Sequence, residues 1–535
     1  MYITEDSNSV DVDAVIVGAG FSGLCMLHKL KKLGLTARII EAGSGVGGTW
    51  YWNRYPGARC DVESMEYSYS FCENLQQEWV WTERFASQEE ILRYLEHVAD
   101  RFQLRSDIML QTKALSCTFS QDTSLWSVET TKANYLAKYC IMATGPLSST
   151  NIPNFPGLSD YQGKTYHTGN WPHQKVDFFG KTVGIIGTGS SAIQSTPVVA
   201  EQAKHLFVFQ RTPNFSVPAG NAPLSDGAQN SLKANYSSFR KQQRGLPAAC
   251  NSLPRRQGAL EATTLERNEV YESYWQKGGL SFLTCFNDLV SNKDSNKTAV
   301  DFIHGKIKDI VKDPVTAKKL SPDHLFGCKR PCSDTGYYQA FNKPNVSLID
   351  ALESPIVSFT KNGIETKDGH FELDSVIFAT GFDAMTGSLD RINITGRNGQ
   401  SLKSKWQAGP VSYLGLSISG FPNLFIMTGP GSPSVLANMV VGSEQHSEWI
   451  SECIKYIEDN NLSTIDVSEA AENEWVEHIN SVADTTIYPT CNSWYLGANI
   501  PGKPRIFMPY VGGFQRYERR CKSVQAESYA GYTFS

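Results

Sequence analysis

The residues with the clearest chemical meaning in this sequence lie in the segment 47–61. A Gly-Gly turn opens it, aromatic residues follow, and Arg59 and Asp61 close it. It comes shortly after a glycine-rich stretch, 18–23, whose acidic partner Glu41 lies about 20 residues on, as is typical of dinucleotide binding. A plain nicotinamide dehydrogenase has no use for such a segment, whereas a flavin enzyme must cover FAD and place a charged pair beside its ring. The sequence therefore predicts that FAD binds here.

The elements expected around this stretch form a β-α-β unit. The apolar run 13–17 predicts a buried strand, and a helix over about 21–33 directs its backbone N–H groups toward the phosphates. A second strand over 35–40 ends at Glu41, which suits the ribose hydroxyls. The glycines of the turn make the tight bend, admit the pyrophosphate and permit close helix packing, respectively: Gly18, Gly20 and Gly23.

A second nucleotide site is predicted further along the chain. A strand over 181–186 leads into a Gly-x-Gly-x-x-Ala fingerprint, and the next strand, 206–210, ends at Arg211. An acid at that position would bind a 2′-hydroxyl, whereas an arginine accommodates a 2′-phosphate, so the site predicts NADPH. The alternative is that Arg211 is a solvated surface charge. The residues expected to bind this nucleotide are Gly187, Thr188, Gly189, Ser190, Ser191, Arg211 and Thr212.

Composition argues against several other classes of protein. The 535 residues are 41% hydrophobic and 19% charged, with a net charge of −5, so a nucleic-acid surface is not expected. No apolar run approaches the roughly 18 residues of a membrane span. The polar N-terminal stretch has no secretory apolar region. We expect a cytoplasmic protein of more than one domain, with no membrane, nucleic-acid or obligatory protein partner.

Cysteine usage points the same way. The twelve cysteines are scattered, with no C-x-x-C pair and no metal-ligand spacing, and the closest pair is Cys328 and Cys332. We therefore expect reduced thiols, no bound metal and no dithiol redox chemistry of the thioredoxin-reductase kind.

Two predicted strands that end in Ala-Thr-Gly, at 141–145 and 376–381, bracket the second fingerprint. We therefore expect an α/β fold with two Rossmann-like dinucleotide-binding domains, the NADPH domain inserted in the FAD domain, plus a mostly helical insertion. The expected boundaries are 1–145 and 381–535 for the FAD domain, 146–220 and 326–380 for the NADPH domain, and 221–325 for the helical insertion.

The segment 161–172 gives the chain a family resemblance. It matches the FxGxxxHxxxW(P/D) fingerprint of Baeyer–Villiger monooxygenases, with Tyr161 in place of the phenylalanine. The segments 47–61 and 329–342 resemble further signatures of that family, and 490–505 resembles its late cofactor-covering loop. The resemblance covers essentially the whole chain and is strongest to the phenylacetone and steroid monooxygenase branch.

This resemblance implies a reaction and a catalytic pair. NADPH would reduce FAD, and the reduced flavin would take up O2 to give a C4a-peroxyflavin that attacks a ketone and yields an ester or lactone. A positive charge must hold the peroxide as an anion, and we assign it to Arg330, since a guanidinium stays charged when desolvated. The family places an aspartate beside this arginine, here Asp61. Arg59 competes for the role of Arg330, and a surface arginine or a helix-capping aspartate are the plain alternatives.

The resemblance suggests further contacts with weaker support. His167 and Trp171 are expected to form a structural hinge at the domain boundary. The remaining expected cofactor contacts are Gly48, Trp50, Tyr55, Asp61, Lys329 and Trp494. For the three aromatic residues of this set, packing in the core is almost as good an explanation. For Lys329, a solvated surface charge is the alternative.

Two other functions stay open. An N- or S-oxygenating flavin monooxygenase shares both glycine fingerprints but usually lacks the Trp-Pro ending found at Trp171. A non-catalytic NADPH-binding redox module is the remoter alternative.

Overall fold

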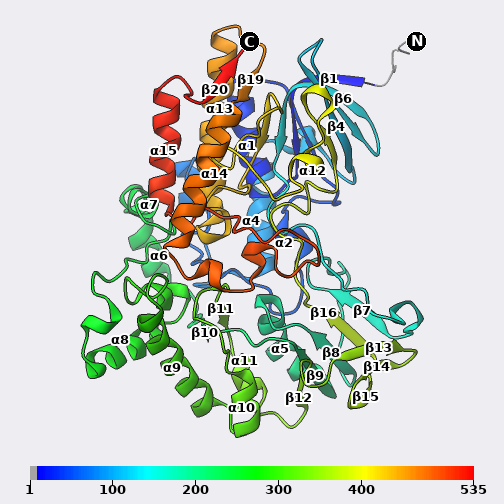
Figure 1. Cartoon of the computed structure of the whole chain (residues 1–535), viewed down its shortest axis with the longest axis vertical. Coiled ribbons are helices and arrows are strands. Elements are labelled where there is room, and N and C mark those ends of the chain that lie inside the picture. The colour runs from blue at the N-terminus through cyan, green and yellow to red at the C-terminus, as the bar shows by residue number, and fades with distance from the viewer. Residues whose placement is uncertain (1–8) are drawn as a thin grey trace.

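The computed structural model describes residues 9–535, so the polar stretch 1–7 lies outside the described residues. Its larger sheet has the strand order β17-β4-β5-β6-β1-β2-β3, with β18 beside β6. Figure 1 labels β1, β4 and β6 of this sheet. The strands are β1 Ser9–Val17, β2 Ala37–Ile40, β3 Ile108–Met109, β4 Ala114–Ser120, β5 Leu125–Thr130, β6 Asn134–Met142, β17 Asn393–Thr395 and β18 Leu424–Ile426.

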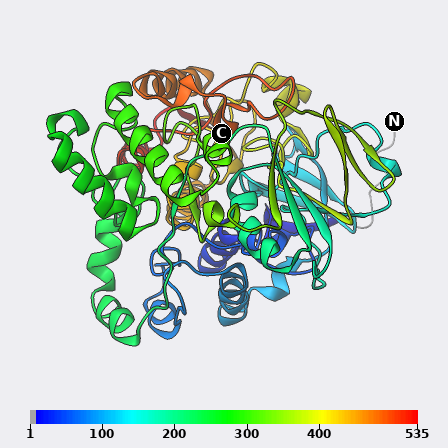
Figure 2. The same ribbon diagram turned by 90° about the horizontal axis from the view of Figure 1, so that it is seen from below.

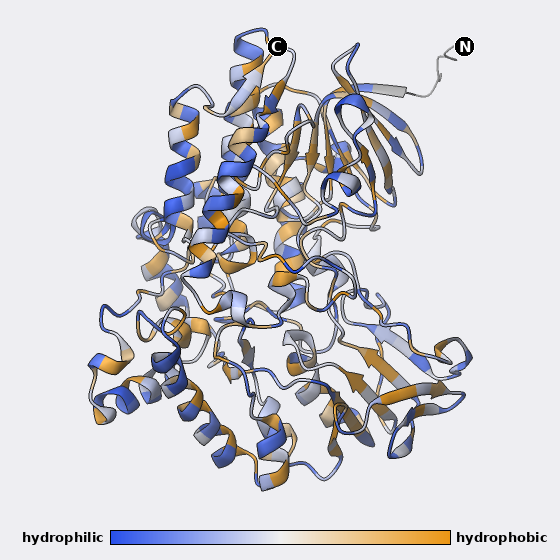
Figure 3. Cartoon of the chain, in the orientation of Figure 1, coloured by the Kyte–Doolittle hydropathy of each residue, from blue (hydrophilic) through white to orange (hydrophobic). Residues whose placement is uncertain are grey.

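The central strands of this sheet are parallel and end together. Val17 of β1 lies opposite Ile40 of β2 on one side and Met142 of β6 on the other. Residues 14–17 of β1 and 139–142 of β6 are buried at every position, so both faces of the sheet are covered there, and Figure 3 colours much of this sheet as hydrophobic. Helix α1, Phe21–Lys32, packs between the sheet and α13, Met439–Asp459. The carboxyl ends of the strands therefore meet at one edge, where α/β folds bind ligands.

The second sheet has five parallel strands in the order β12-β9-β8-β16-β7. They are β7 Lys164–His167, β8 Thr182–Ile186, β9 His205–Gln210, β12 Val346–Asp350 and β16 Ser375–Phe378. Helix α5, Ser190–Gln202, follows β8. A small antiparallel sheet lies beside it, formed by β13 Ile356–Thr360, β14 Gly363–Thr366 and β15 Gly369–Glu372.

Helices cover the remaining surface. Most of the green helices gather at one end of the molecule in Figure 2. They are α6 Asp226–Lys233, α7 Tyr236–Arg244, α8 Thr264–Lys277, α9 Lys293–Ile310 and α10 Pro314–Leu320. The other α-helices are α2 Thr49–Trp52, α3 Glu73–Glu78, α4 Gln88–Arg101, α11 Tyr337–Ala340, α12 Leu402–Lys405, α14 Glu469–Asp484 and α15 Phe514–Ala526. Two short strand pairs complete the fold: β10 Ser216–Pro218 with β11 Cys332–Asp334, and β19 Ile465–Val467 with β20 Tyr532–Phe534.

The elements expected from the sequence lie close to those observed. The strand expected over 35–40 begins later, at Ala37. His167, which we expected to form a hinge at the domain boundary, is the last residue of β7 in the second sheet. Within residues 9–535, every helix is too short or too polar to span a lipid bilayer.

Candidate active site

The turn between β1 and α1 is built for close approach by a ligand. Gly18 has φ of +107°, and a Cβ there would lie 2.5 Å from the carbonyl oxygen of Ala143. A Cβ on Gly23 would lie 1.9 Å from the Gly18 oxygen, so both positions need glycine. At Gly20 the nearest atom to such a Cβ is the Gly48 Cα, at 3.4 Å. The protein itself would tolerate a methyl group there, and the open space fits a pyrophosphate at the helix N-terminus.

Glu41 holds the outer side of this turn. Its carboxylate accepts hydrogen bonds from the backbone N–H groups of Ala19, at 2.8 Å, and Gly43, at 2.7 Å. Burial raises the pKa of Glu41, and these backbone hydrogen bonds oppose that effect. A pocket of about 460 Å³ opens just beyond, which suits the adenosine half of a dinucleotide. Its lining is Ala42, Gly43, Ser44, Tyr51, Trp52, Gln111, Lys113 and Thr131.

The second turn repeats this arrangement. Gly187 has φ of +118°, and a Cβ there would lie 2.4 Å from the Ala379 carbonyl oxygen. A Cβ on Gly189, by contrast, would meet no atom within 4 Å. The Thr188 hydroxyl donates to the carbonyl oxygen of Thr212 at 2.6 Å and so ties the turn to the residue after Arg211. The space beyond Gly189 again fits a phosphate.

The neighbouring serines make side-chain contacts of their own. Ser190 Oγ lies 3.3 Å from the sulfur of Cys332, and Ser191 Oγ lies 3.0 Å from the hydroxyl of Thr168. Their backbone N–H groups, at the start of α5, stay available to a ligand.

Two cations lie at the edge of the second turn. Arg211 directly follows β9 and is exposed. Burial lowers the pKa of Lys329, and the nearby positive charge of Arg211 lowers it further. Two like charges held close together favour an anionic ligand between them, as a 2′-phosphate would be.

Asp61 and Arg330 form a direct ion pair. Arg330 Nη2 donates to both carboxylate oxygens, at 2.8 and 2.9 Å, and Nε donates to one of them at 3.0 Å. Nη1 donates to the Val435 carbonyl oxygen at 2.7 Å. Burial lowers the pKa of Arg330, but the negative charge of Asp61 raises it by more, so the pKa of Arg330 lies above its usual value. The side chain of Arg330 is still 27% exposed, so a fixed positive charge faces an accessible space.

The competing Arg59 is committed elsewhere. It donates to Glu83 at 2.7 Å and to the Phe85 carbonyl oxygen at 2.8 Å. A guanidinium with two such partners has less freedom to face a reacting oxygen than Arg330.

Several hydrogen bonds join the segment 47–61 to the second nucleotide-binding fold. The Tyr55 hydroxyl donates to Gln194 of α5 at 2.8 Å, and the Gln194 amide donates to the Arg59 carbonyl oxygen at 3.2 Å. The backbone N–H of Trp171 donates to the Trp52 carbonyl oxygen at 3.1 Å. The segment 47–61 therefore touches the second nucleotide-binding fold directly.

The aromatic and histidine side chains have mainly structural partners. Trp50 is buried, and its indole N–H donates to the Tyr67 hydroxyl at 3.3 Å. His167 accepts from the Gly169 N–H at 2.9 Å and lies 3.4 Å from the Asn151 carbonyl oxygen. Burial lowers the pKa of His167, so the ring is neutral at pH 7.

The late loop closes over the junction. Lys503 pairs with Asp383 at 2.6 Å, and the Asn499 amide donates to the Phe382 carbonyl oxygen at 2.7 Å. Trp494 is partly exposed, and within the described residues its indole N–H has no hydrogen-bond partner. Such a donor is available to a bound nicotinamide nucleotide.

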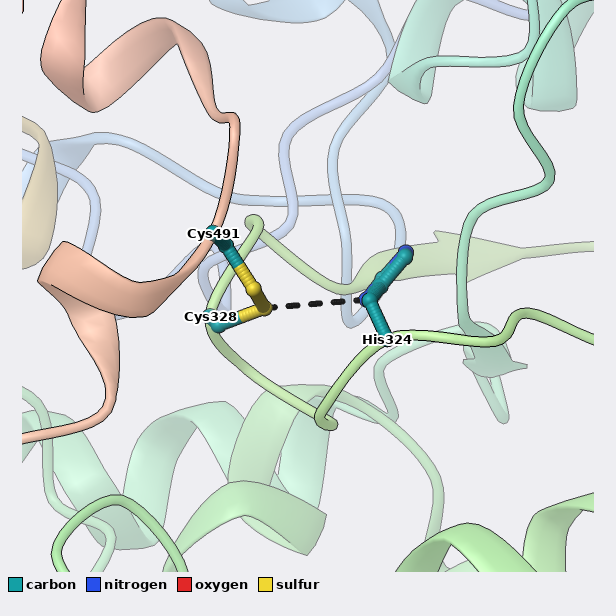
Figure 4. Close-up of side chains that lie close together, drawn as sticks. All are labelled: His324, Cys328 and Cys491. Carbon is teal, nitrogen blue, oxygen red and sulfur yellow. Dashed lines mark hydrogen bonds between the residues drawn. A yellow bond between two sulfur atoms is a disulfide. The ribbon is translucent and has the colours of Figure 1, made fainter.

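The expectation that all cysteines are reduced is wrong for one pair. Cys328 and Cys491 form a disulfide across 163 residues, with their Cα atoms 5.9 Å apart (Figure 4). The ring of His324 lies beside it, with Nδ1 at 3.7 Å from the Cys328 sulfur. The ten other cysteines are free. Spacing along the chain could not reveal this pair, because the fold brings the two residues together from distant segments.

Sequence reasoning also missed two partners of Arg330. The first is the Val435 backbone carbonyl, which no side-chain pattern can reveal. The second is Tyr495, a buried phenol beside the guanidinium. Burial raises the pKa of Tyr495 to about 12, although the positive charge of Arg330 opposes this. Its position directly after Trp494 was the available signal.

Comparison with known proteins gives full-length matches. A family model described as pyridine nucleotide-disulphide oxidoreductase matches residues 15–236. A Baeyer–Villiger monooxygenase of Pseudooceanicola batsensis is 41% identical over 533 residues, which cover 98% of this chain and 97% of that protein. A phenazine N-monooxygenase of Lysobacter antibioticus is 39% identical and covers 98% of both chains.

Solved structures agree with these relatives. Oxidised steroid monooxygenase bound to NADP is 48% identical with a TM-score of 0.94, and the match covers 98% of this chain and 99% of that one. The complex of OTEMO with FAD and NADP is 38% identical with a TM-score of 0.95 and the same coverage.

Proposed function

This chain belongs to the Baeyer–Villiger monooxygenase family, and from that membership we propose that it inserts one oxygen atom of O2 beside the carbonyl carbon of a ketone. The chain is an FAD-containing, NADPH-dependent flavin monooxygenase. FAD, when bound, would supply the hydride acceptance and the O2 activation, which is chemistry that no side chain supplies. The products would be an ester or lactone, water and NADP⁺.

We assign the two cofactors to the two glycine turns. FAD would lie along the turn before α1, with its pyrophosphate beyond Gly20 and its ribose near Glu41. NADPH would lie along the turn before α5, with its pyrophosphate beyond Gly189 and its 2′-phosphate between Arg211 and Lys329. Gly18, Gly23 and Gly187 support this assignment. A Cβ would not fit at these positions, and the tight turns they allow bring the backbone close to the space for each pyrophosphate.

The observation that carries the catalytic proposal is the Asp61–Arg330 pair. Asp61 orients the guanidinium, and the Val435 carbonyl fixes its other edge. The positive charge is preorganised, so it can stabilise negative charge that develops on oxygen without rearranging. A guanidinium also keeps its proton at neutral pH, so Arg330 would not protonate that oxygen.

We propose that the substrate lies near residues 432–438. This segment carries the Val435 carbonyl that contacts Arg330, and most of its side chains are buried. It packs against residues of the helical region, since the Asn438 N–H donates to the Ala248 carbonyl oxygen at 2.8 Å. Linear, aryl and cyclic ketones all fit this reasoning.

A second activity has a specific observation in its favour. The phenazine N-monooxygenase is nearly as similar to this chain as the Baeyer–Villiger relative, at 39% against 41% identity. Identity of this degree does not separate oxygen transfer to a ring nitrogen from oxygen transfer to a ketone. N- or S-oxygenation is therefore the alternative, and a non-catalytic redox module is the remoter one.

We also propose the domain division given by the sequence, with His167 and Trp171 as the hinge. His167 ends β7 of the second sheet, and the Trp171 N–H contacts the Trp52 carbonyl in the segment 47–61. These residues therefore lie where one nucleotide-binding fold would move against the other.

The experiment that tests the proposed function is oxygen transfer by the purified holoenzyme. NADPH oxidation is followed with a panel of linear, aryl and cyclic ketones, a sulfide and a phenazine, and products are identified by mass. Esters or lactones support the proposal. Oxygenation of only the sulfide or the phenazine would favour the alternative, and no oxygenated product would favour the redox module.

A further inference from the structure

The disulfide between Cys328 and Cys491 joins two segments that both reach the proposed catalytic pair. Cys328 directly precedes Lys329 and Arg330. Cys491 lies just before the 3-10 turn Trp494–Leu496. Figure 4 shows the two cysteines arriving from separate segments of the fold.

We propose that this disulfide is a redox-sensitive clamp that positions Arg330 and the turn Trp494–Leu496 for oxygen transfer. Reduction of the clamp leaves both cofactors bound but lets NADPH oxidation proceed without oxygen reaching the substrate. The inference rests on the proposed function for its effect on turnover, but the clamp itself can be tested independently of turnover.

The contacts around Arg330 show how the clamp acts. Tyr495 lies close enough to the guanidinium for each group to influence the other's pKa. The segment 328–330 and the segment 491–495 are therefore connected at two points. The Arg330–Tyr495 contact is polar, and the disulfide is covalent. Without the covalent link, Tyr495 and Trp494 can move away from Arg330 as a unit, because both belong to the same turn.

The two ends of the clamp differ in their surroundings. Cys328 is completely buried, and its neighbour Phe326 packs in the core of the helical region. Cys491 is partly exposed, between exposed residues Thr490 and Asn492. The disulfide therefore ties an exposed loop to a rigid interior, and a reductant can approach from the Cys491 side.

The other attachments of the loop lie at the turn Trp494–Leu496 or after it. The Met508 N–H donates to the Tyr495 carbonyl oxygen at 3.0 Å, and the Lys503–Asp383 pair and the Asn499–Phe382 hydrogen bond follow the turn. On the side of the turn that leads to Cys328, the covalent link is the disulfide. The contacts after the turn hold the far end of the loop in place when the disulfide opens. The expected response is thus a local shift of the turn rather than release of the whole loop.

The redox step is a thiol–disulfide exchange with a dithiol. One reductant thiolate attacks a protein sulfur, the S–S bond breaks, and a mixed disulfide forms with release of one protein thiol. The second reductant thiol then displaces the other protein sulfur. Two electrons and two protons pass to the protein, which ends with two thiols, and the reductant ends as a cyclic disulfide.

His324 is suited to assist this exchange. Its Nε2 lies 3.3 Å from the Pro213 carbonyl oxygen and its Nδ1 lies 3.1 Å from the Leu325 carbonyl oxygen. With the proton on Nδ1, the ring nitrogen nearer to a carbonyl oxygen, this N–H also faces the Cys328 sulfur and can donate to the thiolate that leaves when the disulfide opens. The neutral ring is the form that burial favours, since burial lowers the pKa of His324.

The clamp is tested first by counting thiols in the denatured holoenzyme. Ten thiols are expected without reductant and twelve after dithiothreitol, with a Cys328–Cys491 peptide detected by mass spectrometry before reduction. Native enzyme is then treated with dithiothreitol, and chymotrypsin cleavage after Trp494, a residue of the turn itself, is followed. Cleavage is expected to be faster after reduction, and oxidised glutathione should reverse it.

Coupling is then measured as oxygenated product per NADPH consumed. A small misplacement of reacting groups strongly slows a reaction. Reduction of the disulfide is therefore expected to lower coupling by about tenfold while FAD content stays constant. The variant with both Cys328→Ser and Cys491→Ser should show the low value with or without dithiothreitol. Cys72→Ser, a change at a free and distant cysteine, should respond as wild type does.

Three outcomes would overturn the proposal. Twelve thiols without reductant together with one equivalent of zinc would indicate a metal site at His324, Cys328 and Cys491 instead. Twelve thiols without zinc would indicate no bond at all. Ten thiols, together with chymotrypsin cleavage and coupling that do not change when the disulfide is reduced, would show that the disulfide is only structural. If no oxygenated product forms in either state, the proposed function fails, while thiol count and cleavage still decide the clamp.

Discussion

Asp61 and Arg330 meet through three hydrogen bonds of 2.8 to 3.0 Å, although 269 positions separate them in the chain. Asp61 belongs to the segment that follows α2, and Arg330 lies just before β11, beside the second nucleotide-binding fold. The pair therefore bridges the two parts of the molecule that are proposed to hold the two cofactors. A shift of one part against the other would change where the positive charge lies.

We expect Arg211→Ala to erode the preference for NADPH. The wild type should prefer NADPH over NADH by about tenfold or more, the worth of one charge-assisted contact. Without Arg211, only Lys329 remains at the edge of the turn, so kcat/KM for NADPH should fall while that for NADH stays. Arg211→Lys is the matched control and should keep part of the preference. Equal use of both nucleotides by the wild type would contradict the assignment.

Alanine at two equivalent glycines should separate the two cofactors. Gly20→Ala and Gly189→Ala both introduce a Cβ that the protein accommodates, at 3.4 Å from Gly48 in the first case and with no neighbour within 4 Å in the second. We expect Gly20→Ala to fold but lose FAD, and Gly189→Ala to keep FAD and show a higher KM for NADPH. The bulkier Gly20→Val should yield colourless or unstable protein. Flavin absorbance and steady-state kinetics measure these effects, and full flavin in both Gly20 variants would refute the placement.

Glu66 should make unfolding depend on pH near neutrality. Burial raises its pKa to about 7 from 4.5, and Glu63 adds to the effect. The folded protein then binds more protons than the unfolded chain between these pH values, so the free energy of unfolding falls as pH rises through them, by about 1.4 kcal/mol per pKa unit. Burial of His446 lowers its pKa to about 3 from 6.5, which gives the opposite slope below pH 6.5.

Glu66→Gln isolates this contribution. The variant should gain stability relative to wild type between pH 5 and pH 8, as measured by urea unfolding of the holoenzyme. Glu89→Gln, at an exposed carboxylate on the first turn of α4, is the control and should leave the pH dependence unchanged. Parallel pH profiles for wild type and Glu66→Gln would show that Glu66 is ionised in the folded protein.

Local patterns predicted the nucleotide-binding turns well because each lies within one short β-α-β unit. Gly18 and Gly23 constrain each other across five positions, so their spacing alone carries the information. Contacts between distant segments were harder to predict. The family resemblance supplied Asp61 with Arg330, but nothing in the sequence indicated the Val435 carbonyl or the pairing of Cys328 with Cys491. These depend on how the helical region and the late loop fold back over the second sheet.

Asp61→Ala should cause partial uncoupling. Arg330 would keep its charge and its bond to the Val435 carbonyl but lose the carboxylate that orients it. We expect less ester and more hydrogen peroxide per NADPH, with FAD retained. Asp61→Asn is the matched variant: its amide oxygen, in the place of Oδ2, can accept two of the three hydrogen bonds, so coupling should lie between wild type and Asp61→Ala. If Asp61→Ala couples as well as wild type, the orientation of Arg330 does not depend on the pair.

Arg330→Ala should separate reduction of the cofactor from oxygen transfer. FAD should stay bound, and the NADPH oxidation that remains should drain into hydrogen peroxide, because no fixed positive charge would stabilise negative charge on oxygen. Loss of one preorganised donor costs about 10²–10³ in rate, so ester should fall near the detection limit. Arg330→Lys keeps a charge without the planar fork and should recover only part of the activity. The measurement is ester and peroxide yield per NADPH. Near wild-type coupling in Arg330→Ala would mean that another cation supplies the charge; Lys329 would then lead, since Arg59 is held by Glu83.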